Sequence, residues 1–272
     1  MVACETKLDL IPGNTKTRLV VNALINDQDQ IEIQVSKTIA LGSSASVEFL
    51  NNAQVVVRDE SGKSYPFVFN VGTDKYYYPA GLVAQAGKYY SVSVSVNGLD
   101  EVFSELVMPS KATTAKAVWK DSTDLDSSGY PTGTLTIKLL DRGDEPNYYR
   151  VGLYYYDPVT AYWNMLKPVT TDAAIDNEAI KSEKGTWVFS DRTFNGQNKS
   201  IAFITPFGYA SGSPKYLVVT ESLSEPYFKY FESIENYKKP TGAFAELTPI
   251  YSNIRNGVGI WAGSSIARDT IQ

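Results

Sequence analysis

The chain has 272 residues, enough for two domains of ordinary size, and its 43% hydrophobic and 20% charged residues are typical of a folded globular protein. The net charge of −5 is not gathered into blocks, which argues against nucleic-acid binding and against electrostatic attachment to a membrane. Histidine is absent, so neither a Ser-His-Asp triad nor the usual zinc sites can be built. We therefore expect no metal and no cofactor.

The single cysteine, Cys4, follows the small residue Ala3 at the start of the chain. This is the pattern found where a bacterial lipoprotein signal peptide is cut, and lipid on Cys4 would tether the chain to a membrane. The alternative is a free thiol on a frayed terminus. We expect residues 1–15 to form a lipoprotein tether, and no apolar run approaches the ~18 residues that span a bilayer.

Alternation of apolar and polar residues dominates the first half of the chain, for example over residues 31–36 and 90–96. Turn-forming clusters separate about seven such segments. The last ends at Met108-Pro109-Ser110, because a strand cannot easily continue through a proline. The pattern predicts an Ig-like or transthyretin-like β-sandwich over residues 16–110.

The second half begins with similar strands, such as residues 132–140, and then changes period. Apolar residues from Leu223 to Tyr237 fall at helical spacing, Ser224 is suited to cap the helix, and Pro240 ends it. We predict a β-rich second domain over residues 115–272 that carries one long amphipathic helix at about 224–238. The expected fold is thus mostly β, with the helix docked on the second sheet.

The segment from Tyr148 to Tyr156 divides into two faces. Tyr149, Val151 and Leu153 lie on the natural core face. On the other face, aromatic rings and a guanidinium would be available to stack on sugars or to anchor a protein partner. The candidate binding residues there, with one more beyond the next turn, are Tyr148, Arg150, Tyr154, Tyr156 and Trp163. The simpler interpretation, which we favour, is cross-strand aromatic packing or cover from the predicted helix.

Two further motifs have simple structural interpretations. Asp124–Gly129 matches the first half of a calcium-binding loop, but Leu135 stands where the closing Glu is needed, so we predict a hairpin loop. Gly257–Gly263 lacks a lysine at phosphate-loop spacing and is better explained as a strand with close backbone approach. Scattered carboxylates leave a hydrolase as a third, weaker possibility, because no pair is singled out.

The ordered set of segments resembles a family of Bacteroidota outer-membrane lipoproteins that carry a domain of unknown function. The segments that carry the resemblance are Cys4-Glu5, 18–23, 52–59, 87–90, 147–151, 249–254 and 256–265. The third and fourth of these, with Gly62 between them, are similar to carboxypeptidase-regulatory-like and other Ig-like modules. The resemblance implies an exported lipoprotein, often encoded near TonB-dependent receptors. Glu5–Asp9 is only weakly acidic, whereas surface lipoproteins of that phylum often carry an acidic run, so the periplasmic and cell-surface faces both remain open.

We therefore expect a non-enzymatic outer-membrane lipoprotein, an accessory subunit of a TonB-dependent transporter or of another outer-membrane complex. Its partner would be an outer-membrane β-barrel or another envelope protein. The alternative is a free-standing surface module that binds glycan or peptide, or that serves in adhesion.

Overall fold

In the computed structural model the described residues are 16–40, 43–111, 114–129, 131–167, 169–170, 172, 175, 179–181, 185–206, 215–238 and 249–271. The strands of the first half are β1 (Leu19–Asn26), β2 (Glu32–Lys37), β3 (Gln54–Asp59), β4 (Ser64–Asn70), β5 (Lys75–Tyr77), β6 (Tyr89–Ser95) and β7 (Val102–Val107). The strands that follow are β8 (Thr114–Leu125), β9 (Pro131–Leu140), β10 (Tyr148–Asp157), β11 (Tyr162–Met165), β12 (Val169–Thr170), β13 (Ile180–Lys181), β14 (Trp187–Ser190), β15 (Asn198–Pro206) and β16 (Tyr216–Leu223). The helix α2 (Glu225–Lys238) and the last strand, β17 (Val258–Ile271), complete the fold.

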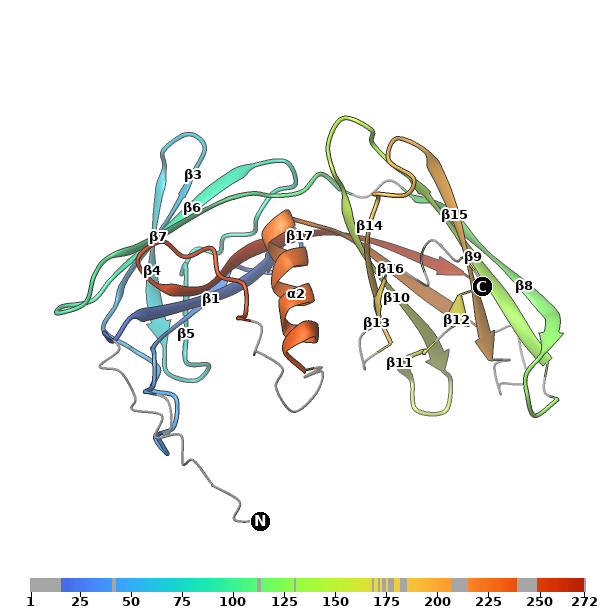
Figure 1. The fold of residues 1–272 in the computed structure, drawn as a ribbon, viewed down its shortest axis with the longest axis horizontal. Helices are drawn as coiled ribbons and strands as arrows, with labels where there is room; N and C mark the ends of the chain where they lie inside the picture. Colours follow the sequence, from blue (N-terminus) through green and yellow to red (C-terminus); the bar gives the residue numbers. More distant parts are fainter. Residues whose placement is uncertain are drawn as a thin grey trace, which may run out of the picture.

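The fold is mostly β, as predicted, and forms two lobes with α2 between them (Figure 1). One continuous sheet runs through both lobes in the order β13-β14-β10-β16-β17-β1-β2-β5-β4-β3-β6-β7, with β11 paired to β10. A second sheet, β12-β15-β9-β8, belongs to the second lobe. Within the described part of the chain, no helix is long and apolar enough to cross a membrane.

Each lobe encloses its own hydrophobic core. In the first lobe the sheet curls until β7 returns beside the segment before β17, where the backbones of Phe103 and Arg255 exchange hydrogen bonds. In the second lobe the two sheets face each other across a core that includes Leu135, Ile137 and Leu139 of β9. Their alternation with exposed or half-buried residues follows the two-residue period of a strand, so these buried positions were predictable.

The strand β17 belongs to both lobes. Its first half, Val258–Ser264, pairs in parallel with β1, and its second half, Ser264–Ile271, pairs antiparallel with β16. Ile254 and Trp261 pack in the first core, although the expected second domain ran from 115 to 272. The structure differs here because the chain returns to the first lobe after α2, and only the register of β17 reveals this.

The glycines of β17 permit the close approach that the sequence predicted. Gly259 has a φ of 116°, and a Cβ at this position would lie far inside van der Waals contact of the Val21 carbonyl oxygen on β1. At Gly263 a Cβ would collide with the Met108 side chain. The expectation of a strand in place of a phosphate-binding loop over 257–263 is confirmed.

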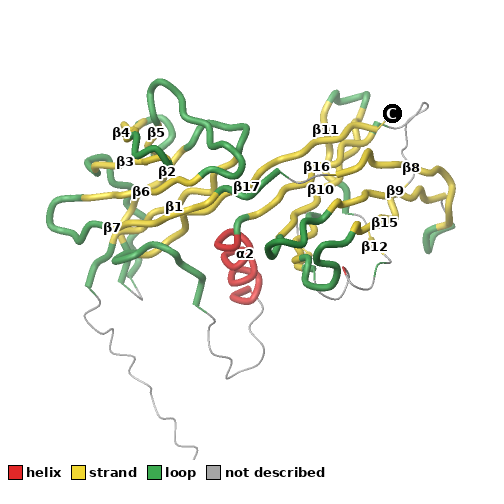
Figure 2. Tube along the Cα trace, turned by 90° about the horizontal axis from the view of Figure 1, so that it is seen from above, coloured by secondary structure: helices red, strands yellow, loops and turns green. Residues whose placement is uncertain are grey.

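The helix α2 lies within one residue of its predicted bounds and projects from one side of the sheet between the lobes (Figure 2). Ser224 precedes it, and its carbonyl oxygen accepts hydrogen bonds from the N–H groups of Tyr227 and Phe228 at 3.0 and 3.1 Å. Its hydroxyl, expected to cap the helix, instead accepts the Gly263 N–H at 3.0 Å, and the Ser224 N–H donates to the Gly263 carbonyl at 2.9 Å. The start of the helix is therefore fastened to the midpoint of β17.

Replacing Gly259 with alanine should lower the free energy of unfolding by more than about 3 kcal/mol, because the added methyl group would force β17 away from β1. Gly62→Ala is the matched control: Gly62 also has a positive φ, 82°, but nothing lies within 4 Å of its added Cβ. That change should cost only the conformational strain, about 1–2 kcal/mol. Urea denaturation of both variants measures the difference, and equal losses would contradict the close-approach argument.

Candidate functional site

The two faces of β10 are arranged as the sequence predicted. Tyr149, Val151 and Leu153 are buried in the second core, with Tyr155 packed against its edge. The opposite face carries the candidate binding residues of this strand. The structure divides these into a pair beneath α2 and a group farther along the strand.

Arg150 and Tyr148 lie beneath α2. The Arg150 guanidinium contacts both carboxylate oxygens of Glu221 on β16, with N–O distances of 2.6 to 2.9 Å, and donates to the Tyr227 hydroxyl on α2 at 2.9 Å. The Tyr148 ring stacks on Phe228 at a centroid distance of 4.7 Å. Both side chains therefore join α2 to the sheet, which is the helix cover that we favoured.

The charges of this cluster are matched internally. The Glu221 side chain is 10% exposed and that of Arg150 is 25% exposed. Burial opposes the charge on Arg150, but Tyr227 and Glu221 outweigh it and raise the pKa of the guanidinium above its ordinary value. Burial also raises the pKa of Tyr227. The Glu221 carboxylate oxygens and the Tyr227 hydroxyl occupy the donors of the guanidinium, which leaves little of Arg150 for a ligand.

Tyr154, Tyr156 and Trp163 form the second group, called here the aromatic patch. Tyr156 and Trp163 are opposite each other in the β10–β11 pair, and their rings meet edge to face at 5.3 Å. Trp163 is 39% exposed, and both tyrosines are half-buried. Lys215 approaches the Tyr156 ring, with its Nζ 5.9 Å from the centroid.

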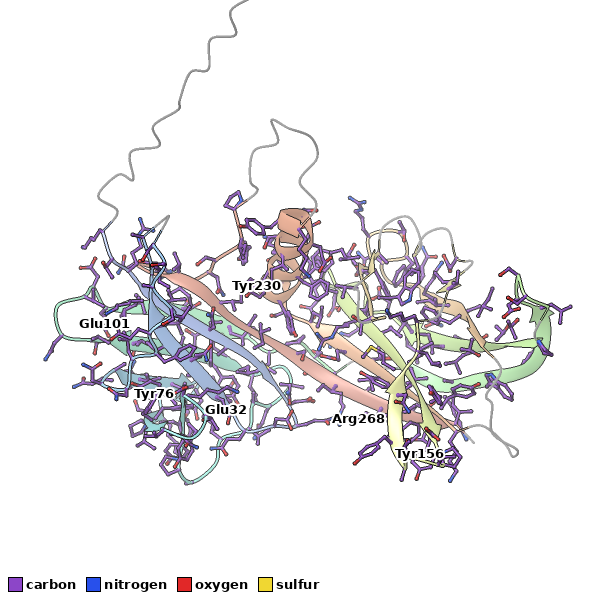
Figure 3. All side chains as sticks on the ribbon, turned by 90° about the horizontal axis from the view of Figure 1, so that it is seen from below. Glu32, Tyr76, Glu101, Tyr156, Tyr230 and Arg268 are labelled. Carbon is purple, nitrogen blue, oxygen red and sulfur yellow. The ribbon has the colours of Figure 1, made fainter. Side chains whose placement is uncertain are left out.

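Arg268 of β17 lies in the same region of the second lobe as Tyr156 (Figure 3), and its charge acts on Tyr154. The strand register explains this. Arg268 on β17 pairs with Val219 on β16, and Val219 pairs with Gly152 on β10. Gly152 is two residues before Tyr154, so the two lie on the same face of β10, one row apart. Cationic side chains thus flank aromatic rings on an outward sheet face. Such a surface can pack against a flat apolar or aromatic group and attract negative charge at its rim.

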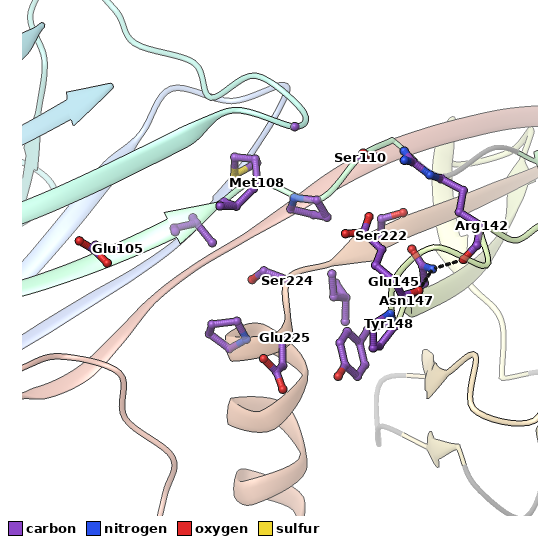
Figure 4. A pocket seen from close by; sticks show the side chains of 17 residues that line it. Glu105, Met108, Ser110, Arg142, Glu145, Asn147, Tyr148, Ser222, Ser224 and Glu225 are labelled. Carbon is purple, nitrogen blue, oxygen red and sulfur yellow. Dashed lines mark hydrogen bonds between the residues drawn. The ribbon is translucent and has the colours of Figure 1, made fainter. Parts of the chain in front are cut away.

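A cleft between the lobes was not predicted. Its volume is about 470 Å³ (Figure 4). Four regions of the chain form its walls: Gly87 before β6, the end of β7 with Met108, the loop before β10, and the junction of β16 with α2. The sequence marked Met108-Pro109-Ser110 only as a domain boundary, because nothing local shows which distant segments meet there.

Several polar groups of this cleft already have partners, either within the cleft or just outside it. The Asn147 side-chain amide donates to the carbonyl oxygens of Arg142 and Glu145 at 2.8 and 2.7 Å, which fixes the loop before β10. Arg142 is paired with Asp144 at 3.0 Å, and Glu225 with Lys229 at 2.8 Å. Across the residues that the structure describes, no cluster of His, Cys, Asp or Glu could hold a metal ion.

Two candidates from the sequence remain, the partial calcium-loop motif and Cys4. The half-match to a calcium loop is the turn between β8 and β9, where the Asp126 carboxylate accepts the Ser128 N–H at 2.8 Å and Gly129 has a φ of 80°. The predicted hairpin is confirmed. Cys4 lies outside the described residues.

No curated protein matches this chain. Among solved structures, one described as "Biofilm associated protein - BSP domain" is similar over 93% of this chain, with 9% sequence identity and a TM-score of 0.25, and the chain spans 59% of that protein. The family model for a domain of unknown function, DUF4249, matches residues 5–270. The chain belongs to the DUF4249 family. The expected likeness to a family of unknown function over nearly the whole chain is thereby confirmed.

In this DUF4249 chain, Glu221→Gln should lower the free energy of unfolding by about 3 kcal/mol, because it leaves the Arg150 charge beneath α2 without a counter-charge. The matched control is Glu225→Gln, which removes the same charge from an exposed i,i+4 pair with Lys229 at the helix start. Its loss should stay below about 1 kcal/mol. Chemical denaturation measures the free energy of unfolding of both variants. Similar losses would show that the Arg150–Glu221 contact does not hold the helix on the sheet.

Proposed function

We propose that this protein is a non-enzymatic outer-membrane lipoprotein that serves as an accessory subunit of a TonB-dependent transporter or of another outer-membrane complex. The aromatic patch carries the proposal. It places one exposed ring, Trp163 at 39%, and two half-buried tyrosine rings on a sheet, beside Lys215 and Arg268. Tryptophan, tyrosine and arginine are the residues that most often dominate the binding energy of protein interfaces.

The two-lobed shape suits such a role. Residue 16, where the described chain begins, leads into β1 in the first lobe, whereas the patch lies on the second lobe (Figure 1). A lipid on Cys4 would then hold the first lobe near the membrane and leave the patch available to a partner. Within this proposal the first lobe is an Ig-like or transthyretin-like sandwich, and the membrane face stays open.

The same patch supports the alternative of a free-standing surface module that binds glycan or peptide. The edge-to-face contact between Tyr156 and Trp163 leaves the outer surface of each ring able to pack against a sugar or a side chain. The net charge of −5 argues against nucleic acid under either proposal.

Affinity purification of the tagged full-length protein from its native membranes should recover an outer-membrane β-barrel in stoichiometric amount. Trp163→Ala should abolish that recovery, because it removes the most exposed ring of the patch. Tyr162→Ala is the matched control: Tyr162 is 72% exposed and adjacent in sequence, but it points to the other side of the hairpin. Recovery of the protein alone, or equal loss in both variants, would contradict the accessory proposal.

The intact mass of the protein from native membranes should include a diacylglycerol and an amide-linked acyl chain. In Cys4→Ser that mass should be absent, because serine lacks the thiol that accepts the lipid, and without acyl chains the protein should leave the membrane fraction. Unmodified Cys4 in the native protein would overturn the anchor while leaving the patch experiment valid.

A further inference from the structure

A groove separates α2 from the outer face of β1 and β2 in the first lobe. Its volume is about 380 Å³, at the lower end of the range for small-molecule pockets. Figure 3 shows Tyr230 on α2 and Glu32 on the first lobe, the two sides of this region. The groove is separate from the aromatic patch and from the interlobe cleft, since it shares no lining residue with either.

Two free amides form the middle of the groove floor. Asn22 of β1 and Gln34 of β2 are directly opposite each other in the sheet and both are half-buried. Neither side-chain amide has a hydrogen-bond partner among the described residues, whereas the neighbouring Asn26 and Gln30 amides are bonded to Asp29 and to the Tyr78 carbonyl. Each free amide offers two N–H donors and a carbonyl acceptor to a ligand.

The position of Asn22 depends on the close approach of β17. A Cβ at Gly259 would lie 3.0 Å from the Asn22 Oδ1. The glycine therefore leaves room for the Asn22 amide. Ile260, one residue on, pairs with Asn22 and gives the floor an apolar edge. The same feature that joins β17 to β1 therefore keeps this amide in the groove.

The wall of the groove is aromatic. Tyr230 is half-buried against the cluster that includes Ile260, and the other rings of α2 do not reach this pocket. Leu24 adds a side chain that is 45% exposed. An aromatic ring beside paired amides offers one apolar surface and several hydrogen-bonding groups, the combination that suits a pyranose ring with its C–H face and its hydroxyls.

Charge and backbone pairing narrow the ligand class. Among the described side chains that line the groove, Lys75 is the one cation, and it is paired with Glu32 at 2.7 Å. An anionic ligand would find no free counter-charge. A peptide could not add a strand here, because β1 lies between β17 and β2, and β2 lies between β1 and β5.

We propose that the groove between α2 and the β1–β2 face binds a neutral oligosaccharide, with Tyr230 packed on a sugar ring and Asn22 and Gln34 hydrogen-bonded to its hydroxyl groups. Charged Lys75 and Glu32 hold each other in place at the rim. This inference does not depend on the partner proposed above, because the two surfaces lie on different lobes.

Isothermal titration of the full chain with neutral hexasaccharides of glucose, xylose and mannose tests the proposal. At least one should bind with a dissociation constant below about 1 mM. Tyr230→Ala and the double variant Asn22→Ala/Gln34→Ala should each weaken that binding by about tenfold or more. Tyr230→Phe, which keeps the ring, should retain most of it.

Two controls distinguish binding in this groove from binding elsewhere on the protein. Gln54→Ala removes an exposed amide from β3, far from the groove, and should change nothing. Loss of sugar binding in Trp163→Ala, with binding retained in Tyr230→Ala, would place the sugar on the aromatic patch and overturn the proposal. Three other outcomes would also overturn the proposal. The protein could bind none of the neutral hexasaccharides, it could prefer oligogalacturonate or a hexapeptide, or the Asn22/Gln34 double variant could bind the sugar as well as the unchanged protein. Because those two amides are unbonded surface groups, their removal tests the site even if Tyr230→Ala destabilises α2.

Discussion

The pairing of one strand with two lobes is the constraint on which the rest of the structure depends. Between Val258 and Ser264, β17 is a parallel neighbour of β1, and from Ser264 onward it is an antiparallel neighbour of β16. The two ends of the described chain are thus joined across more than two hundred residues. Such non-local pairing forms slowly, because loop-closure entropy is lost before the contacts form. The parallel pairing of β17 with β1 also needs a glycine at position 259, because a Cβ there would collide with the Val21 carbonyl oxygen of β1.

The position of α2 follows from this strand. Ser224 exchanges two hydrogen bonds with the backbone of Gly263, near the point where β17 changes partner, so the helix starts at the boundary between the lobes. Arg150 and Glu221 then hold the next turn through Tyr227. A buried ion pair of this kind adds little net stability compared with apolar packing, but a single missing partner is costly. Its effect is to give α2 one orientation, and that orientation forms one wall of the groove.

Features with a local period were predictable from the sequence. The faces of β10 and the span of α2 each depend on side-chain spacing within one element, and the close approach at Gly257–Gly263 follows from residue type. Features that depend on register between distant segments were not predictable. Asn22 and Gln34 look like ordinary polar residues on alternating strands, and only their pairing places two free amides together. The interlobe cleft and the course of β17 were missed for the same reason. The resemblance to a family of unknown function could be stated in advance, because an ordered set of weak segments does not require the register.

The two exposed surfaces differ in chemistry because they lie on different parts of the same sheet. The aromatic patch borders the second half of β17, where Arg268 contributes a cation, and the groove borders its first half, where Gly259 makes room for an amide. The two surfaces have no residue in common. The helix α2 lies between them: its Tyr230 faces the groove, while its Tyr227 contacts Arg150, two rows from Tyr154 on the same face of β10. The helix therefore contributes different side chains to the two regions, and its attachments at Ser224 and Arg150 fix the position of Tyr230 beside the groove.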